Sequence, residues 1–265
     1  MKKWRIKICC GLIFIPLLMQ AQEEKIKVND RIGIEFGTNV FYGSANAPDQ
    51  IRISKSVYEY DDLYYGYPNS NQVLNNIYGG IKYESFFYNN RFGFAAGLRF
   101  SKFSSEINAD GNQKYFIWLF SQTETTANYL TVKNIKQGNY YLGVPLELRY
   151  VMSGKETSFP FDQYFKLGIA VNCLLSTTNS VIFYDPAMAK YAGAVEEAIK
   201  KPSPLNAWVY PVYGLRFSKI KNIWFNMEFN LLGFLIGKNA HPFIRQDIGM
   251  GVQLSVQIPL NKKIL

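Results

Sequence analysis

Few side chains of this chain have a type and spacing that could perform catalysis. His241 is the only histidine, and Asp247 follows it closely enough in the sequence to orient its imidazole. A hydrolase or acyl-transfer site also needs a nucleophile, and no serine lies close to His241. Cys173 is the only cysteine outside the first ten residues and has no metal-ligand partner nearby. We therefore predict no catalytic residues, cofactor or metal, with a lipid-modifying enzyme that depends on His241 as an alternative.

Charged side chains of both signs recur at every second position inside apolar segments, with glycines among them. This alternation places the charges on one face of a strand and the apolar residues on the other. Five acidic and six basic residues nearly balance, so they could pair inside a closed sheet, where unpaired charges would be costly. The predicted interior charge network comprises Glu35, Lys82, Glu84, Arg99, Glu147, Arg149, Lys166, Arg216, Glu228, Arg245 and Asp247.

Two long segments between the apolar ones carry residues suited to binding. Tyrosines give large, rigid contact areas at low entropic cost, so a tyrosine-rich segment predicts a contact surface for a protein or glycan. Self-packing of the loop is the alternative. The tyrosines are Tyr58, Tyr60, Tyr64, Tyr65 and Tyr67. In segment 177–206, Asp185 before Pro186 is typical of a helix start. A solvated amphipathic helix is the interpretation we favour, and the alternatives are that it caps the barrel or contacts lipopolysaccharide phosphates.

Eight segments of strict alternation must position these side chains. In one of them, Phe94 and Leu98 share a face while Arg99 lies on the other. The predicted strands are 31–42, 77–87, 92–101, 140–152, 165–176, 207–218, 223–231 and 244–258. Segments 114–121 and 129–135 either extend the third and fourth strands, which we favour, or form an additional pair that would give ten strands.

The lengths of the connections and strands favour a membrane barrel. Short connections alternate with the long ones 43–74, 108–139 and 177–206, as in outer-membrane barrels. The strands approach the nine to eleven residues that cross a bilayer at a tilt. We therefore predict an all-β fold, a closed antiparallel up-and-down transmembrane β-barrel of eight strands. A soluble sandwich or lipocalin-like barrel is the alternative.

Two details of this barrel can be predicted from aromatic and proline positions. Aromatic residues near strand ends are typical of interfacial girdles, and here they are Tyr140, Tyr150, Trp208, Tyr210 and Trp224. Pro145 lies inside a strand, where it cannot donate a ladder hydrogen bond, so we expect a β-bulge at that position.

The first 21 residues have the order of a secretory signal peptide. A basic start with Lys2, Lys3, Arg5 and Lys7 precedes an apolar run that is too short to span a bilayer, and Ala21 suits cleavage. This predicts a signal peptide at 1–21 and a barrel domain at 22–265. Four of the charges behind the formal net charge of +9 lie in the signal segment, and the remaining Lys and Arg form no dense run. Nucleic-acid binding is therefore not expected.

Three short stretches read YYLGVPLELRY (140–150), FAAGLRF (94–100) and GMGV (249–252). They resemble, in that order, the aromatic-Leu-x-x-Pro-Leu strand, the preceding Gly-Leu strand and the glycine-containing last strand of the PorT-like outer-membrane β-barrel family of Gram-negative bacteria. The resemblance implies fold and location. Some members of this family assist protein secretion, but no residue match here selects that role.

Together these observations predict an integral protein of the cell outer membrane without enzymatic activity, acting as a scaffold or accessory through its outer loops. Its expected partners are outer-membrane lipid, lipopolysaccharide and envelope proteins, with a role in secretion or the envelope. The alternatives are a small passive porin, a lipid-modifying outer-membrane enzyme and a soluble periplasmic lipocalin-like binding barrel.

Overall fold

The alternating segments form long strands, because β-branched and aromatic residues at every second position suit a pleated sheet with two unlike faces. The computed structural model of the chain describes residues 29–42, 51–52, 71–88, 90–109, 114–122, 127–152, 161–220, 223–237 and 248–260. Its strands are β1 (Asn29–Tyr42), β2 (Ile51–Arg52), β3 (Asn71–Phe87), β4 (Phe92–Asn108), β5 (Phe116–Gln122), β6 (Ala127–Val151), β7 (Phe161–Phe183), β8 (Leu205–Ile220), β9 (Ile223–Ile236) and β10 (Ile248–Pro259).

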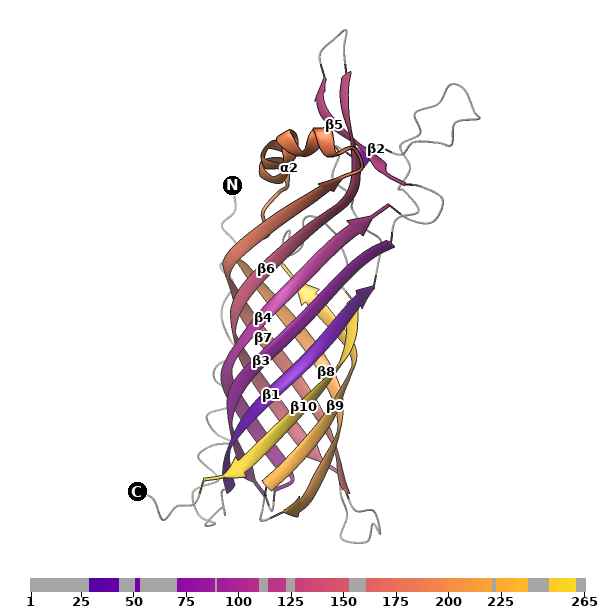
Figure 1. Cartoon of the computed structure of the whole chain (residues 1–265). Coiled ribbons are helices and arrows are strands. Elements are labelled where there is room, and N and C mark those ends of the chain that lie inside the picture. The colour runs from indigo at the N-terminus through magenta and orange to yellow at the C-terminus, as the bar shows by residue number, and fades with distance from the viewer. Residues whose placement is uncertain are drawn as a thin grey trace, which may run out of the picture.

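Eight of these strands form a ring in which every neighbour is antiparallel and adjacent in chain order. The order is β1-β3-β4-β6-β7-β8-β9-β10, and β10 pairs back with β1 so that Ile34 lies opposite Val256. Figure 1 shows the strands inclined around a common axis. The predicted all-β, antiparallel up-and-down architecture with eight strands in the ring is confirmed.

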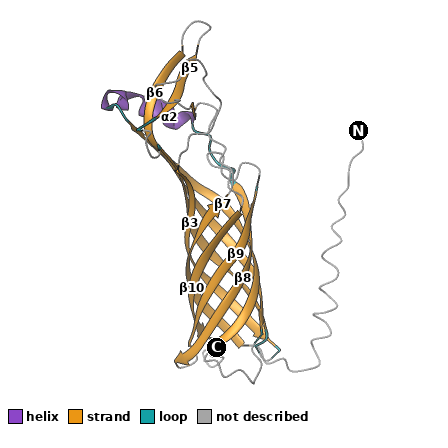
Figure 2. Cartoon of the chain, turned by 90° about the vertical axis from the view of Figure 1, so that its right-hand side faces the viewer, coloured by secondary structure: helices purple, strands orange, loops and turns teal. Residues whose placement is uncertain are grey.

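One side of the ring rises well above the other. β6 and β7 have 25 and 23 residues, whereas β1 has 14 and β10 has 12. The upper part of β6 pairs with β5, which in turn pairs with the two-residue β2, so both lie outside the ring (Figure 2). The predicted segment 129–135 therefore does extend the fourth strand. Segment 114–121 does not extend the third strand, because β5 is a separate strand of the projecting sheet.

The two faces of the ring have opposite polarity. Apolar side chains point outward and are widely exposed, as for Leu98 at 59% and Ile34 at 67%. The intervening side chains point inward, and among them the carboxylates of Glu35 and Glu147 are almost completely buried. The sheet is thus apolar outside and charged inside.

Three of the five predicted girdle residues are wrongly placed by the sequence prediction. Trp208, Tyr210 and Trp224 are buried inside the ring, and only Tyr140 and Tyr150 lie on its outer face. Trp208, Tyr210 and Arg216 occupy alternate positions of the same strand, so their side chains all point into the ring. The distance of a residue from the strand end does not change the face on which it lies.

The bulge expected at Pro145 is also wrong. Pro145 lies opposite Ala170 of β7 without a register shift. The ladder to β4 keeps its register as well, although no pairing is formed at Pro145 itself, since Ala96 pairs with Leu146 and Arg99 with Gly143. The missing N–H is accommodated by local loss of pairing.

The helix predicted in the third long connection is present. Asp185 precedes the 3-10 helix η2 (Pro186–Tyr191) and accepts a 2.9 Å hydrogen bond from the backbone N–H of Ala187. The helix α2 (Ala192–Ala198) follows directly. Both lie beside the projecting part of the sheet in Figure 1. None of the helices in the described ranges is long and apolar enough to cross a membrane.

Candidate functional site

The centre of the ring holds an ionic layer built around Glu147 of β6. The Glu147 carboxylate lies 2.7 Å from Lys82 Nζ, 3.1 Å from Lys166 Nζ and 3.3 Å from Arg99 Nη2. These partners come from β3, β7 and β4, and β3 does not neighbour β6 in the ring. The side chains therefore meet across the interior, and this contact holds strands together that share no backbone ladder.

Three further carboxylates complete the layer. Glu35 on β1 pairs with Lys82 and with Arg99 Nε, each at 2.6 Å. Glu228 on β9 pairs with Lys166 and lies 3.2 Å from Arg149 Nη2, while Arg149 Nε lies 3.0 Å from Glu84. The structure thus brings eight of the eleven predicted network residues into one connected cluster of buried side chains. A charge buried without such partners would cost several kcal/mol, about 3–5 when one partner of a pair is removed.

Neutral side chains tie the charges together. Tyr210 and Tyr164 donate 2.7 Å hydrogen bonds to Glu147 and Glu228. Gln253 donates a 2.7 Å bond to Glu228 and accepts a 2.9 Å bond from the Tyr78 hydroxyl. These residues were missed by the sequence prediction, which considered only charged groups, although alternation places Tyr78 on the same face as Lys82.

Glycines make room for the long charged side chains. Gly80 lies directly between Glu35 and Arg99 in the ladder of β1, β3 and β4. A Cβ at Gly80 would lie 3.1 Å from Glu35 Oε1 and closer still to the backbone of β4. A side chain at this position would therefore displace the ionic layer.

A second ionic group lies where β7 begins and β8 ends. Arg216, the ninth predicted residue, donates bonds of 3.0 and 2.7 Å to Asp162 Oδ2, and its guanidinium lies 3.9 Å from the centre of the Trp224 ring. The Arg31 guanidinium also lies over the Trp224 ring, 3.1 Å from its centre. The sequence prediction did not include Arg31 and Asp162 in the network. Arg31 shares the parity of Glu35 within the predicted strand 31–42, and extending the strand 165–176 to its true start would have found Asp162.

Several predicted residues lie outside the described residues. They are Arg245, Asp247, His241, Tyr58, Tyr60, Tyr64, Tyr65 and Tyr67, together with the signal segment 1–21. Within the described ranges, no group of three or more His, Cys, Asp or Glu side chains is arranged to hold a metal ion.

Above the ionic layer the interior becomes apolar. Phe41, Trp208 and Phe103 pack together, with ring centres 5.0 and 5.8 Å from Phe41. This cluster continues into the projecting sheet through Ile107 and Ile135, both fully buried. Together with the Arg216 group, the ring thus holds three successive groups of interior side chains.

α2 is fastened to the projecting sheet by its carboxyl end. Asn179 on β7 donates a 2.8 Å bond to the Glu196 carbonyl, and Gln137 on β6 donates a 3.1 Å bond to the Lys200 carbonyl. Val195 is completely buried in the apolar cluster. The Asn179 amide thus adds a second donor to the Glu196 carbonyl, which also accepts from the Ile199 backbone N–H, and the Gln137 amide holds the chain just after the helix.

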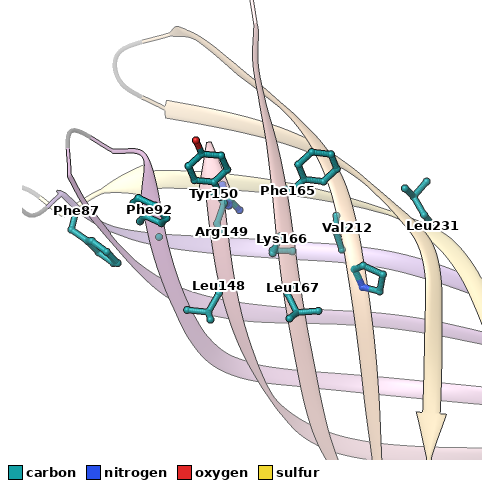
Figure 3. Close-up of a pocket in the computed structure, with 12 residues that line it drawn as sticks. Phe87, Phe92, Leu148, Arg149, Tyr150, Phe165, Lys166, Leu167, Val212 and Leu231 are labelled. Atoms are coloured by element: carbon teal, nitrogen blue, oxygen red, sulfur yellow. The ribbon is translucent and has the colours of Figure 1, made fainter. Parts of the chain in front are cut away.

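The outer wall carries a band of apolar side chains edged by aromatic rows. Figure 3 shows Phe92, Tyr150 and Phe165 side by side near the lower end of the ring, with Leu148 and Leu167 in the adjoining row. These residues line a shallow depression of about 480 Å³. At the upper end Phe100 lies beside Tyr140, with ring centres 6.1 Å apart. Ten residues of β6 separate Tyr140 from Tyr150, which corresponds to a band of about 25 Å at a tilt of about 40°.

Above this band the outer face of β4, β6 and β7 is polar. Burial alone would raise the pKa of Glu106, but hydrogen bonds from Asn108 and Asn134 and the Lys136 ammonium outweigh burial and lower that pKa below its usual range. The Glu106 carboxylate is therefore ionised at neutral pH. Asn108, Asn134, Lys133 and Lys136 line a depression of about 310 Å³ around it.

The geometry defines a class of structure: an eight-stranded antiparallel ring with an apolar outer wall and a densely paired ionic interior. No protein-family model matches the chain, and a search of curated proteins finds no significant match. The resemblance to the PorT-like family therefore stays a prediction.

Proposed function

We propose that this chain is an integral β-barrel of the outer membrane that acts as a non-enzymatic scaffold or accessory, after removal of residues 1–21. The observation that carries the proposal is the inverted polarity of the ring. Leu98, Leu254 and Leu167 are each more than half exposed, while Lys82 and Glu147 are buried. Soluble monomers rarely expose apolar patches above a few hundred Å², so lipid is the solvent that suits this wall.

The dimensions of the apolar band support the same proposal. A band of about 25 Å between two aromatic rows is the height that outer-membrane barrels present to lipid. A soluble lipocalin-like barrel would place its apolar side chains in the interior, and here the interior centre holds paired charges. A passive porin is disfavoured because the ionic layer and the apolar cluster fill the ring, as expected for eight strands.

The interaction surface of the proposed scaffold is the projecting part of the molecule. β5, the upper parts of β6 and β7, and α2 extend beyond the apolar band. They would therefore lie in the aqueous phase outside the membrane, where they can contact other envelope proteins.

Envelope fractionation combined with gel mobility tests this proposal. The full-length protein should fractionate with the outer membrane, and the detergent-folded protein should migrate differently on gels with and without boiling, because closed barrels resist unfolding by detergent. A soluble periplasmic protein without a mobility shift would refute the membrane assignment. Loss of lipid-modifying activity on substituting His241 would instead support the enzyme alternative.

A further inference from the structure

Three cations follow one another on the outer face of the projecting sheet, beginning level with Tyr140 of the upper aromatic row and continuing above it. Lys102 lies opposite Tyr140 in the ladder, and its ammonium is 5.4 Å from the Tyr140 ring centre. Lys136 lies two outward positions above Tyr140 on β6, and Lys133 lies higher on the same strand. Among the described carboxylates, only Glu106 pairs with any of the three, through a 3.6 Å contact to a half-exposed Lys136. The face therefore has excess positive charge.

Gly138 lies between these lysines and the hydroxyls of the neighbouring strands. It separates Ser104 of β4 from Thr178 of β7 in the ladder. A Cβ at Gly138 would lie 2.9 Å from the Thr178 hydroxyl oxygen and 4.0 Å from Lys102 Cε, so the glycine lets the Thr178 hydroxyl and the Lys102 side chain lie close to the β6 backbone. Hydroxyl and ammonium groups are thus gathered on one face, which is a combination that suits phosphate oxygens.

A polar depression lies on the same face. It has a volume of about 310 Å³, and its lining includes Lys136 and Ser180, which lie opposite each other in the ladder of β6 and β7. Asn134 donates a 2.6 Å bond to Glu106, and Asn108 donates a 3.0 Å bond to the same oxygen. Amide and carboxylate groups of this kind are suited to sugar hydroxyls, which both donate and accept hydrogen bonds.

We propose that this Lys102–Lys136 surface, formed by Lys102, Ser104, Lys136, Thr178 and Ser180 around Gly138, binds the phosphorylated sugar headgroup of an outer-leaflet glycolipid. The inference rests on the proposed outer-membrane location. Lys102 lies opposite Tyr140, at the upper edge of the apolar band, and Lys136 lies four residues above Tyr140 on β6. Four residues correspond to about 10 Å if the strand rises about 3.3 Å per residue at a tilt of about 40°. Headgroups occupy roughly 5–7 Å on each side of the hydrocarbon core, so the two lysines span their depth.

The test compares two double variants of the full-length, detergent-folded protein. Lys102→Gln with Lys136→Gln should weaken binding of bisphosphorylated lipid A in mixed micelles about 25-fold at low salt, since one lysine near an anionic surface contributes roughly fivefold. Lys114→Gln with Lys190→Gln is the matched control, and Lys114 is an exposed lysine that precedes β5. Lys190 also lies over a tyrosine, at 5.1 Å from the Tyr191 ring centre, but stands on η2 away from the surface. The control should change binding less than twofold.

Three further measurements can support or refute the proposal. Dephosphorylated lipid A should bind the wild type no better than phosphorylated lipid A binds the Lys102/Lys136 variant. Equal losses in both double variants, or full competition by inorganic phosphate at the concentration of the lipid, would overturn the headgroup assignment. Lys102→Arg with Lys136→Arg should retain binding, which separates charge from folding. Unchanged binding in a variant that keeps the boiling-dependent mobility shift refutes only this site, whereas absence of the shift in the wild type refutes the proposed function.

Discussion

At the scale of single residues, Glu147 is the side chain on which the ionic layer depends most. It contacts three cations from three strands, so Glu147→Gln would leave Lys82, Lys166 and Arg99 to share the remaining carboxylates. We expect the free energy of unfolding in detergent to fall by about 3–5 kcal/mol, because a buried charge loses its partner. Urea titration followed by tryptophan fluorescence measures this loss.

The matched control for Glu147 is Glu197→Gln on the exposed face of α2, which should change stability by less than about 0.5 kcal/mol. Removing a cation together with the anion, as in Glu147→Gln with Lys166→Met, should restore part of the loss. An unfolding midpoint of Glu147→Gln equal to that of the wild type would show that the layer is not needed for stability.

Glycines facing aromatic rings are the second determinant at this scale. A Cβ at Gly214 would overlap the ring of Tyr164, which is buried and donates to Glu228. Gly214→Ala should therefore lower the free energy of unfolding of the protein by about 1–3 kcal/mol, because the added methyl group overpacks the interior. Gly193→Ala in α2 meets nothing within 4 Å and should be neutral or stabilising by up to about 1 kcal/mol. Urea midpoints of the two variants compare them directly, and equal effects would contradict the packing argument.

At the scale of elements, alternation predicts the ring because the side-chain period of a strand is two and a one-residue error would reverse every face. The same rule places Trp208 and Trp224 on the inner face. The sequence prediction assigned them to an outer girdle because it gave their position near strand ends more weight than the alternation of faces. Strand lengths could not be predicted in this way. Above the apolar band the outer face of β4, β6 and β7 becomes polar, as at Ser104, Lys136 and Thr178, so the alternation fades while the backbone ladder continues.

The candidate site could also be predicted only in part. The sequence assigns each charged residue of the ionic layer to a face of its strand, but it does not assign the partners of that residue. Lys82 and Glu147 lie on non-adjacent strands and meet only because the ring closes. The surface around Gly138 depends on the register of three strands, which a single sequence does not fix.

The attachment of α2 is a prediction at the same scale. Val195 is buried, whereas the neighbouring Ala194 is exposed, so Val195→Asp should detach the helix and Ala194→Asp should not. Limited proteolysis should then cut the segment between β7 and β8 faster in Val195→Asp only. Both variants should keep the boiling-dependent mobility shift, because α2 lies outside the ring. Equal cleavage rates would mean that the burial of Val195 does not hold the helix.

At the scale of the whole molecule, the side chains inside the ring determine whether a solute could pass through it. The lower aromatic and arginine group, the ionic layer and the upper apolar cluster lie one above another within the ring. The side chains of the ionic layer are almost fully buried, and some of its ion pairs, such as Lys82–Glu147 and Arg149–Glu228, join strands that are not neighbours in the ring. Activity of the whole molecule must then come from its outer surfaces, which are the apolar band, the projecting sheet and α2.

This filling predicts that the protein does not conduct. Liposomes that contain the folded wild-type chain should swell in isotonic arabinose no faster than protein-free liposomes, because eight strands leave an interior that side chains can fill and Glu147 holds cations from three strands across it. Liposomes with a general porin serve as the positive control for sugar entry. Glu147→Gln, which weakens the layer without shortening a side chain, should also remain closed, since the apolar cluster around Phe41 and Trp208 still blocks the upper half. Swelling of wild-type liposomes at the porin rate would favour the passive-pore alternative and would require the interior side chains to rearrange in the membrane.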